Sequence, residues 1–218
     1  MKENSLEIAK YIQIARKKHK EGNIYQANEI YKNLINQKIY TYDLLISYGL
    51  FCKEINNLKI AKNLFFLSIK KYPLKINSYI LLAEILRKEN NINDALKTLY
   101  AAKKIDKFNS EIDYSLSITF KTIQSFKNAI LSIDSAINQN PNNQIYQILK
   151  ADILIESSNN EDAKELLLNL KLPKDSILFF QREILLSKIF INQKQYRLAE
   201  EVLLELRELF SKERILYL

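Results

Sequence analysis

Residues 76–109 have the sequence INSYILLAEILRKENNINDALKTLYAAKKIDKFN, and the alanine near its centre belongs to a series that runs along the chain. The series is Ala27, Ala61, Ala95, Ala129 and Ala163, spaced 34 residues apart, followed by Ala199 after 36. A fixed spacing of this length indicates a repeat array in which each period forms one supersecondary unit.

Other positions keep the same spacing. Twelve residues before each alanine stands a small residue, namely Ala15, Gly49, Ala83, Ser117, Ala151 and Ser187. Four residues after each alanine stands a large residue, namely Tyr31, Phe65, Leu99, Ile133, Leu167 and Leu203. Short polar pairs precede several alanines: Gly22-Asn23, Asn56-Asn57, Asn90-Asn91 and Asn159-Asn160. Small residues allow two helix axes to cross closely, and Asn and Gly tolerate the left-handed backbone of a tight turn. The pattern therefore predicts pairs of helices joined by short turns.

These residues resemble the tetratricopeptide repeat family, whose period is 34 residues and whose unit is a pair of antiparallel helices. The third repeat carries the match in Tyr79, Leu82, Ala83, Leu86, Ala95, Leu99 and Ala102, and Pro73 closes the second repeat. The resemblance covers about residues 8–212. It implies an all-α fold, a right-handed superhelical solenoid of about six helix-turn-helix repeats.

We expect one domain over residues 1–218, with repeats at about 8–41, 42–75, 76–109, 110–143, 144–179 and 180–213. Residues 214–218 are expected to begin a further helix or to fold back as an improvised cap. Three charged residues stand where the family pattern is apolar: Lys18, Asp113 and Lys150. Two extra residues near 172–175 predict a looser junction between repeats five and six.

The composition agrees with long helices and a continuous core, because the chain has only two glycines and three prolines and is 47% apolar. No apolar run approaches the roughly 18 residues that cross a bilayer, and the polar start lacks the apolar core of a signal peptide. We therefore expect a cytoplasmic protein. The single cysteine, Cys52, cannot form an internal disulfide, and its position in the repeat predicts a buried thiol rather than a reactive one.

The net charge of +8 invites a nucleic-acid interpretation, but we consider nucleic acid an improbable partner. The cations are mostly lysine, in a chain whose wealth of Asn, Ile and Tyr suggests a coding bias toward adenine and thymine. The charge is uneven, since residues 1–107 hold 20 Lys and Arg against 10 Asp and Glu, whereas residues 108–218 hold 13 against 15. Either the basic half steers an acidic partner, or it is a solvated lysine surface.

The residues needed for catalysis are missing from the sequence. His19 is the only histidine, and Gly22 and Gly49 are the only glycines, so neither a His/Cys metal site nor a Gly-rich phosphate loop can be assembled. No serine lies in a Gly-x-Ser-x-Gly elbow. We expect no enzyme activity, no metal and no cofactor, and we look for function in a binding surface.

In arrays of this family the first helix of each repeat lines the concave wall, which is the surface such proteins use for binding. Three rows of equivalent positions are expected there. The first row is Ile12, Ile46, Ile80, Tyr114, Ile148 and Ile184. The second row is Arg16, Leu50, Glu84, Ile118, Asp152 and Lys188. The third row is His19, Lys53, Arg87, Lys121, Ile155 and Ile191. These rows predict a groove with an apolar floor and, in repeats one to four, a basic row beside it.

Two interpretations of the isoleucine row stay open. It either docks the apolar anchors of a bound peptide, whose acidic groups would meet Lys53, Arg87 and Lys121, or it packs neighbouring first helices together. For the whole chain, the first hypothesis is a non-catalytic scaffold that binds a protein or peptide in the concave groove. The second is a substrate-presenting or oligomerising arm of a sulfotransferase or glycosyltransferase whose catalytic domain lies elsewhere. Self-association through the C-terminal end is a third option.

Overall fold

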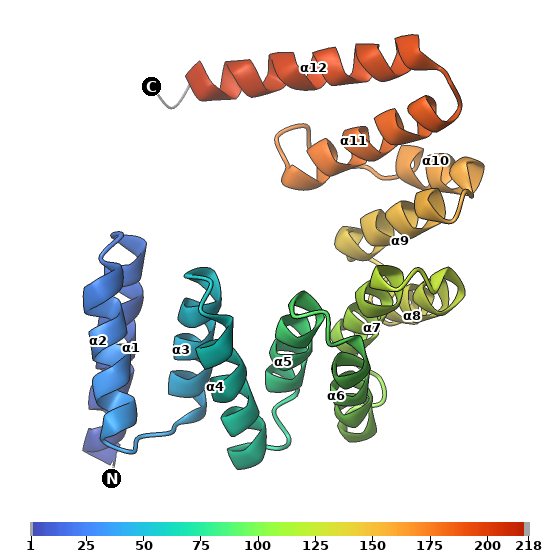
Figure 1. Cartoon of the computed structure of the whole chain (residues 1–218). Coiled ribbons are helices and arrows are strands. Elements are labelled where there is room, and N and C mark those ends of the chain that lie inside the picture. Colours follow the sequence, from blue (N-terminus) through green and yellow to red (C-terminus); the bar gives the residue numbers. More distant parts are fainter. Residues whose placement is uncertain (1, 216–218) are drawn as a thin grey trace. The chain divides into compact units, whose positions relative to one another are not determined.

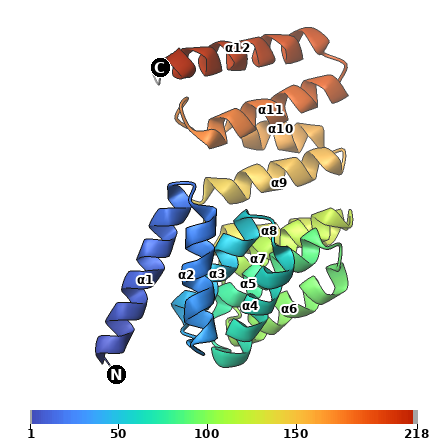
Figure 2. The same ribbon diagram turned by 60° about the vertical axis from the view of Figure 1, so that its left-hand side comes forward.

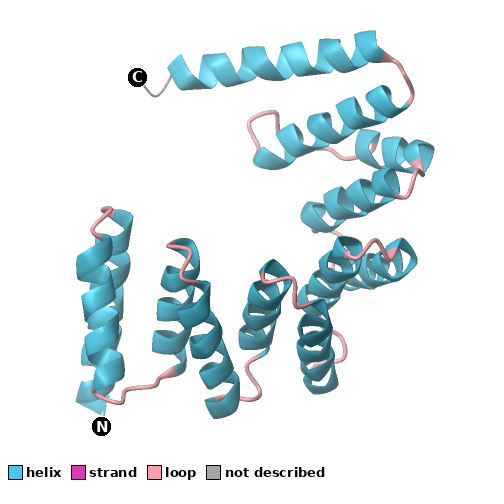
Figure 3. Cartoon of the chain, in the orientation of Figure 1, coloured by secondary structure: helices cyan, strands magenta, loops and turns pink. Residues whose placement is uncertain are grey.

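The computed structural model describes residues 2–215, with side chains over residues 6–209, and this part of the chain contains only helices and the loops between them (Figure 3). It divides into two compact units, residues 1–107 and 108–218. Each unit holds three helical hairpins.

The hairpins follow one another in chain order within each unit (Figures 1 and 2). The first unit consists of α1 (Lys2–Lys20), α2 (Ile24–Asn36), α3 (Tyr42–Glu54), α4 (Leu58–Lys71), α5 (Ile76–Lys88) and α6 (Ile92–Ile105). The second unit consists of α7 (Ser110–Thr122), α8 (Phe126–Gln139), α9 (Gln144–Glu156), α10 (Asn160–Leu168), α11 (Ile177–Asn192) and α12 (Tyr196–Ile215). The odd-numbered helices are the first helices of the hairpins, and the even-numbered ones are the second helices.

The turn inside every hairpin contains one residue with positive φ, between 56° and 79°. These residues are Gly22, Asn56, Asn90, Gln124, Ser158 and Lys194. In the third hairpin, the Asn90 N–H donates to the Arg87 carbonyl at 3.0 Å and the Asn91 N–H donates to the Leu86 carbonyl at 2.8 Å. This pair of bonds is the Schellman motif, which satisfies the last carbonyls of the first helix. In the fifth hairpin the left-handed residue is Ser158, so the expected turn pair Asn159-Asn160 was placed one residue too late.

Glycine should stabilise this turn where a side chain now occupies the left-handed region. Ser158→Gly is expected to raise the free energy of unfolding by about 1 kcal/mol, because the Cβ of an L-residue crowds the following carbonyl at positive φ. Ser157→Gly is the matched control, since Ser157 has φ −87° and its Oγ donates to the Leu154 carbonyl at 3.0 Å. Urea denaturation should show a gain only for the first variant, and equal effects of the two changes would contradict this account.

The small residues of the repeat lie at the crossing of the two helices of a hairpin. Ala15, Ala83 and Ala151 are at most 1% exposed. In the second hairpin, a Cβ added to Gly49 would lie 2.8 Å from Cζ of Phe65 and closer still to the next ring atom. In the fourth hairpin, the Ser117 Oγ donates to the Ala129 carbonyl across the crossing at 2.9 Å. Close approach of the helix axes therefore explains why this position is small in every repeat.

A larger residue at the helix crossing of the second hairpin should destabilise the fold. Gly49→Ala forces the buried Phe65 ring to move, and we expect it to lower the free energy of unfolding by about 1–3 kcal/mol in urea denaturation. Adding Phe65→Leu should make room for the methyl group, so the double variant should lose less than the sum of the two single changes. Strictly additive losses would show that the two positions do not share this contact.

The charged departures from the repeat pattern have partners. Asp113 is buried, and its Oδ2 accepts hydrogen bonds from Ser135 Oγ and Gln139 Nε2, both at 2.7 Å. Lys150 forms an ion pair with Asp134 at 2.8 Å, and Lys18 forms one with Glu21 at 3.4 Å. A buried carboxyl with two donors is tolerated in a position that is otherwise apolar.

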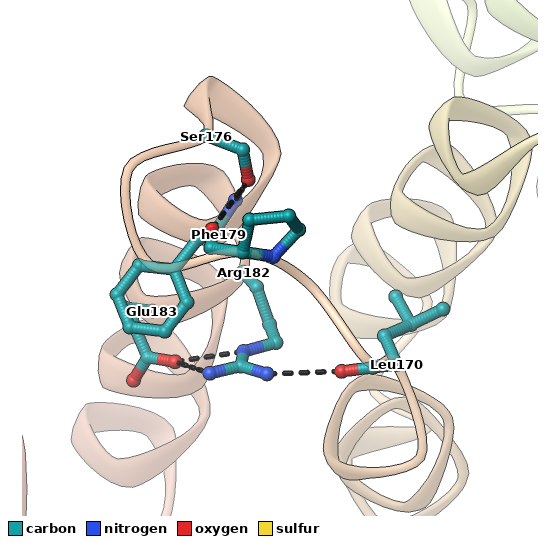
Figure 4. A network of polar contacts seen from close by, with 6 residues as sticks. Leu170, Ser176, Phe179, Arg182 and Glu183 are labelled. Atoms are coloured by element: carbon teal, nitrogen blue, oxygen red, sulfur yellow. Dashed lines mark hydrogen bonds and ion pairs between the residues drawn. The ribbon is translucent and has the colours of Figure 1, made fainter.

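The extra residues between the fifth and sixth hairpins form a loop from 169 to 176 after the short helix α10. Arg182 holds this loop, because its Nη1 donates to the Leu170 carbonyl at 3.0 Å while its other nitrogens contact Glu183 (Figure 4). Ser176 caps α11 by accepting the Phe179 N–H at 3.1 Å (Figure 4). The loop is longer than the loops between the other hairpins, and the hydrogen bond from Arg182 ties it to α11.

The last helix differs from the expectation. α12 is continuous from Tyr196 to Ile215, so no new helix begins at residue 214, and residues 216–218 lie outside the described part. Its Leu203 is 45% exposed, whereas the equivalent residues of the other five repeats, Tyr31, Phe65, Leu99, Ile133 and Leu167, are at most 1% exposed.

Candidate functional site

The first-helix face, by which we mean the three rows of equivalent positions, is only partly exposed. In the first row, Ile12, Ile46 and Ile148 are between 4% and 8% exposed. Ile80 and Tyr114 are half-buried, and Ile184 is 48% exposed. For the three buried isoleucines the structure supports the packing interpretation, and Ile184 alone of the row is exposed.

The second and third rows form polar contacts between consecutive first helices. Lys53 Nζ lies 2.8 Å from Glu84 Oε2, and Lys121 Nζ lies 2.6 Å from Asp152 Oδ2. Arg16 Nη2 donates to Ser47 Oγ at 2.7 Å. In all three contacts the partners are 31 residues apart, although Ser47 lies outside the three rows. The Lys53–Glu84 and Lys121–Asp152 pairs occupy the same repeat positions, so this contact recurs in both units.

These contacts change the interpretation of the basic row. Lys53 and Lys121 are each 20% exposed and already paired, and Lys121 also lies 2.8 Å from Glu156. Arg87 also has a partner within the chain. His19 Nδ1 lies 3.3 Å from Glu54 Oε2, and its ring meets Phe51 edge-on. The row predicted for an acidic partner therefore makes internal contacts, while Leu50 and Ile118 of the second row are half-buried.

The pKa values of two row residues reflect this pairing. Burial alone would raise the pKa of Glu84, but the hydrogen bonds and charges of Lys53 and Lys88 outweigh it and lower the pKa below its ordinary value of 4.5. Burial alone would lower the pKa of Lys121, but its hydrogen bonds to Asp152 and Glu156 raise it. Both shifts mean that the paired, charged forms are favoured in the folded protein.

The pairing of Glu84 predicts a pH-dependent contribution to stability. Because its folded pKa is lowered, the contribution is present above the ordinary value of 4.5 and is lost as the pH falls through the folded pKa. Glu84→Gln should therefore lower the free energy of unfolding by about 1 kcal/mol at pH ~7 and have little effect at pH ~2, as measured by urea denaturation. Glu205→Gln, an exposed position on α12, is the control and should show no such difference. An equal loss for Glu84→Gln at both pH values would contradict the assignment.

A hollow of about 330 Å³ opens on the first-helix face of the second unit, between α7, α9 and α11. It is lined by Tyr114, Ile145, Ile148, Leu149, Asp152, Gln181, Ile184 and Leu185. Four of these belong to the predicted rows: Tyr114, Ile148, Asp152 and Ile184. Ile145 and Gln181 stand three residues before Ile148 and Ile184, so the helical period could have found them as residues of the same face.

The charges beside this hollow are balanced. Asp152 is shared between Lys121 and Lys188, whose Nζ lies 3.5 Å from Asp152 Oδ1, and Glu156 also contacts Lys121. Two cations therefore face two carboxylates. The arrangement offers an apolar floor beside a neutral polar edge, which suits an aliphatic ligand better than an anion.

The described residues hold no candidate metal centre. They contain no group of three or more His, Cys, Asp or Glu side chains that could hold a metal ion. Burial raises the pKa of the Cys52 thiol to about 12, as expected for a buried and unreactive cysteine. Within the same residues, no helix is both long and apolar enough to cross a lipid bilayer.

Comparison with solved structures identifies the fold. A tetratricopeptide repeat protein from Parabacteroides merdae superposes with a TM-score of 0.77 at 13% identity, covering 94% of this chain and 79% of that one. PilF of Pseudomonas aeruginosa gives a TM-score of 0.69 at 13% identity, with coverages of 94% and 92%. YrrB, described as a TPR protein with an unusual peptide-binding site, gives 0.54 at 16% identity, with coverages of 88% and 89%. No protein-family model and no curated protein matches the chain. The chain has the tetratricopeptide-repeat fold, as its sequence predicts.

Proposed function

We propose that this chain is a non-catalytic scaffold that binds a peptide or protein segment on the first-helix face, with the hollow between α7, α9 and α11 as the anchor point. The main support is the exposure of aliphatic side chains around this hollow, since Ile145 is 46% and Ile184 is 48% exposed. Each would lose contact with water when a ligand covers it, and such burial is worth about 25 cal/mol per Å².

The ligand is defined by its aliphatic side chains. Lys121 is already paired with Asp152 and Glu156, so an acidic ligand would have to compete with two carboxylates of the chain itself. An apolar anchor has no such competition. YrrB, a protein of the same fold, is described as having a peptide-binding site, which supports a peptide as the ligand of this chain.

Peptide selection tests the proposal without knowledge of the natural partner. Peptides selected on the intact chain from a random library should be rich in Leu, Ile, Val or Phe. The double variant Ile145→Ser and Ile184→Ser should weaken their binding by about tenfold or more, because two apolar contacts are lost. Both side chains are nearly half exposed, so the free energy of unfolding should change little. Fluorescence anisotropy with labelled peptides measures the effect.

Leu131→Ser is the matched control, because Leu131 is a 61% exposed aliphatic residue on α8 that does not line this hollow. It should leave the affinity unchanged. If the selected peptides bound the double variant as tightly as the native chain, the hollow would not be their site and the proposal would fail.

A further inference from the structure

A second hollow, of about 560 Å³, lies between α8, α9 and α10 in the second unit. Its lining includes Ile130, Lys150, Leu154, Asp162, Glu165 and Leu166. At about 100° per residue, Lys150 and Leu154 point away from the side of α9 that carries Ile148 and Asp152. The two hollows therefore open on opposite faces of α9.

The first unit contains a hollow of about 370 Å³ at the same place in the repeat. It is lined by Lys62, Leu82, Leu86, Asp94, Lys97 and Thr98, which stand two periods, or 68 residues, before Ile130, Lys150, Leu154, Asp162, Glu165 and Leu166. Because the two hollows are lined by equivalent positions, the side chains of the hollow in the first unit can be compared one by one with those of the hollow in the second unit.

The charges of the two hollows differ. In the first unit, Asp94 pairs with Lys97 at 3.4 Å and Lys62 pairs with Glu89 at 2.6 Å. In the second unit, Ile130 replaces Lys62 and Glu165 replaces Lys97. The rim thereby loses both of its cations, while Lys150 stands at the position of Leu82 and Leu166 at that of Thr98.

Two carboxylates at this rim have no cationic partner. Asp162 and Glu165 are both exposed on α10, and neither forms an ion pair with any residue from 6 to 209. The lysine of this hollow, Lys150, is held by Asp134 at 2.8 Å. Asp162 lies in the first turn of α10, where the helix dipole favours it, but Glu165 lies beyond that turn. Like charges three residues apart on a helix repel each other, and a cation bound between Asp162 and Glu165 would relieve this repulsion.

We propose that this hollow binds a cationic amphipathic segment of a partner protein. An aliphatic side chain of the segment enters between Ile130, Leu154 and Leu166, and a lysine or arginine pairs with Asp162 and Glu165. The acidic rim repels nucleic acid, which leaves a basic peptide as the ligand that matches both floor and rim. The site is independent of the one on the first-helix face.

A short fluorescent peptide of alternating leucine and arginine is the probe, and its leucine and glutamate counterpart is the control probe. The intact chain should bind the arginine peptide more tightly than the glutamate peptide, and this difference should shrink with added salt. Glu165→Lys restores the pair seen between Asp94 and Lys97, and we expect it to weaken binding of the arginine peptide by about tenfold or more.

Two variants make the result specific. Glu205→Lys changes the net charge equally at an exposed position on α12, and it should leave the affinity unchanged. The double variant Ile145→Ser and Ile184→Ser should also bind the arginine peptide normally, because it alters only the hollow between α7, α9 and α11. Circular dichroism confirms folding, and Asp162→Asn serves as a second test if Glu165→Lys is unfolded. The proposal is overturned if the arginine peptide does not bind, if both probes bind alike, or if Glu165→Lys has no larger effect than Glu205→Lys.

Discussion

Each hairpin depends on the close crossing of its two helices. The backbone of the first helix approaches the second so closely that Gly49 has no room for a methyl group beside Phe65. Where a serine stands instead, as at Ser117, its hydroxyl bonds to the backbone of the second helix. This constraint fixes the position of each second helix on its first helix, and so repeats one geometry along each unit.

The repeated geometry explains why polar contacts recur at one separation. Consecutive first helices present equivalent residues in the same register, so Lys53 reaches Glu84 in one unit as Lys121 reaches Asp152 in the other. These contacts hold consecutive first helices together, so the residues that form them are already paired within the chain. The aliphatic side chains that stay exposed on this face, such as Ile145 and Ile184, are the ones that we propose for binding.

Much of the fold could be predicted from the sequence because small residues and turn residues report on backbone geometry directly. Ala95 allows a neighbouring helix to approach closely, and Asn90 tolerates the left-handed backbone of the turn. The surface was less predictable. The helical period places Ile46 on a face, but it does not tell whether that face meets water or the next helix. The partners of Lys53 and Lys121 depended on the separation of 31 residues, which becomes visible only when the hairpins are stacked.

The exposure of Leu203 has a consequence for motion. In the other repeats the side chain at this position is almost completely buried, so nearly all of its apolar surface is removed from water. In α12 the leucine remains almost half exposed to water, so this position contributes less buried apolar area than Ile133 in α8 or Leu167 in α10. Transient fraying of the second unit should therefore start at α12, while the two faces of α9 keep their form during such events.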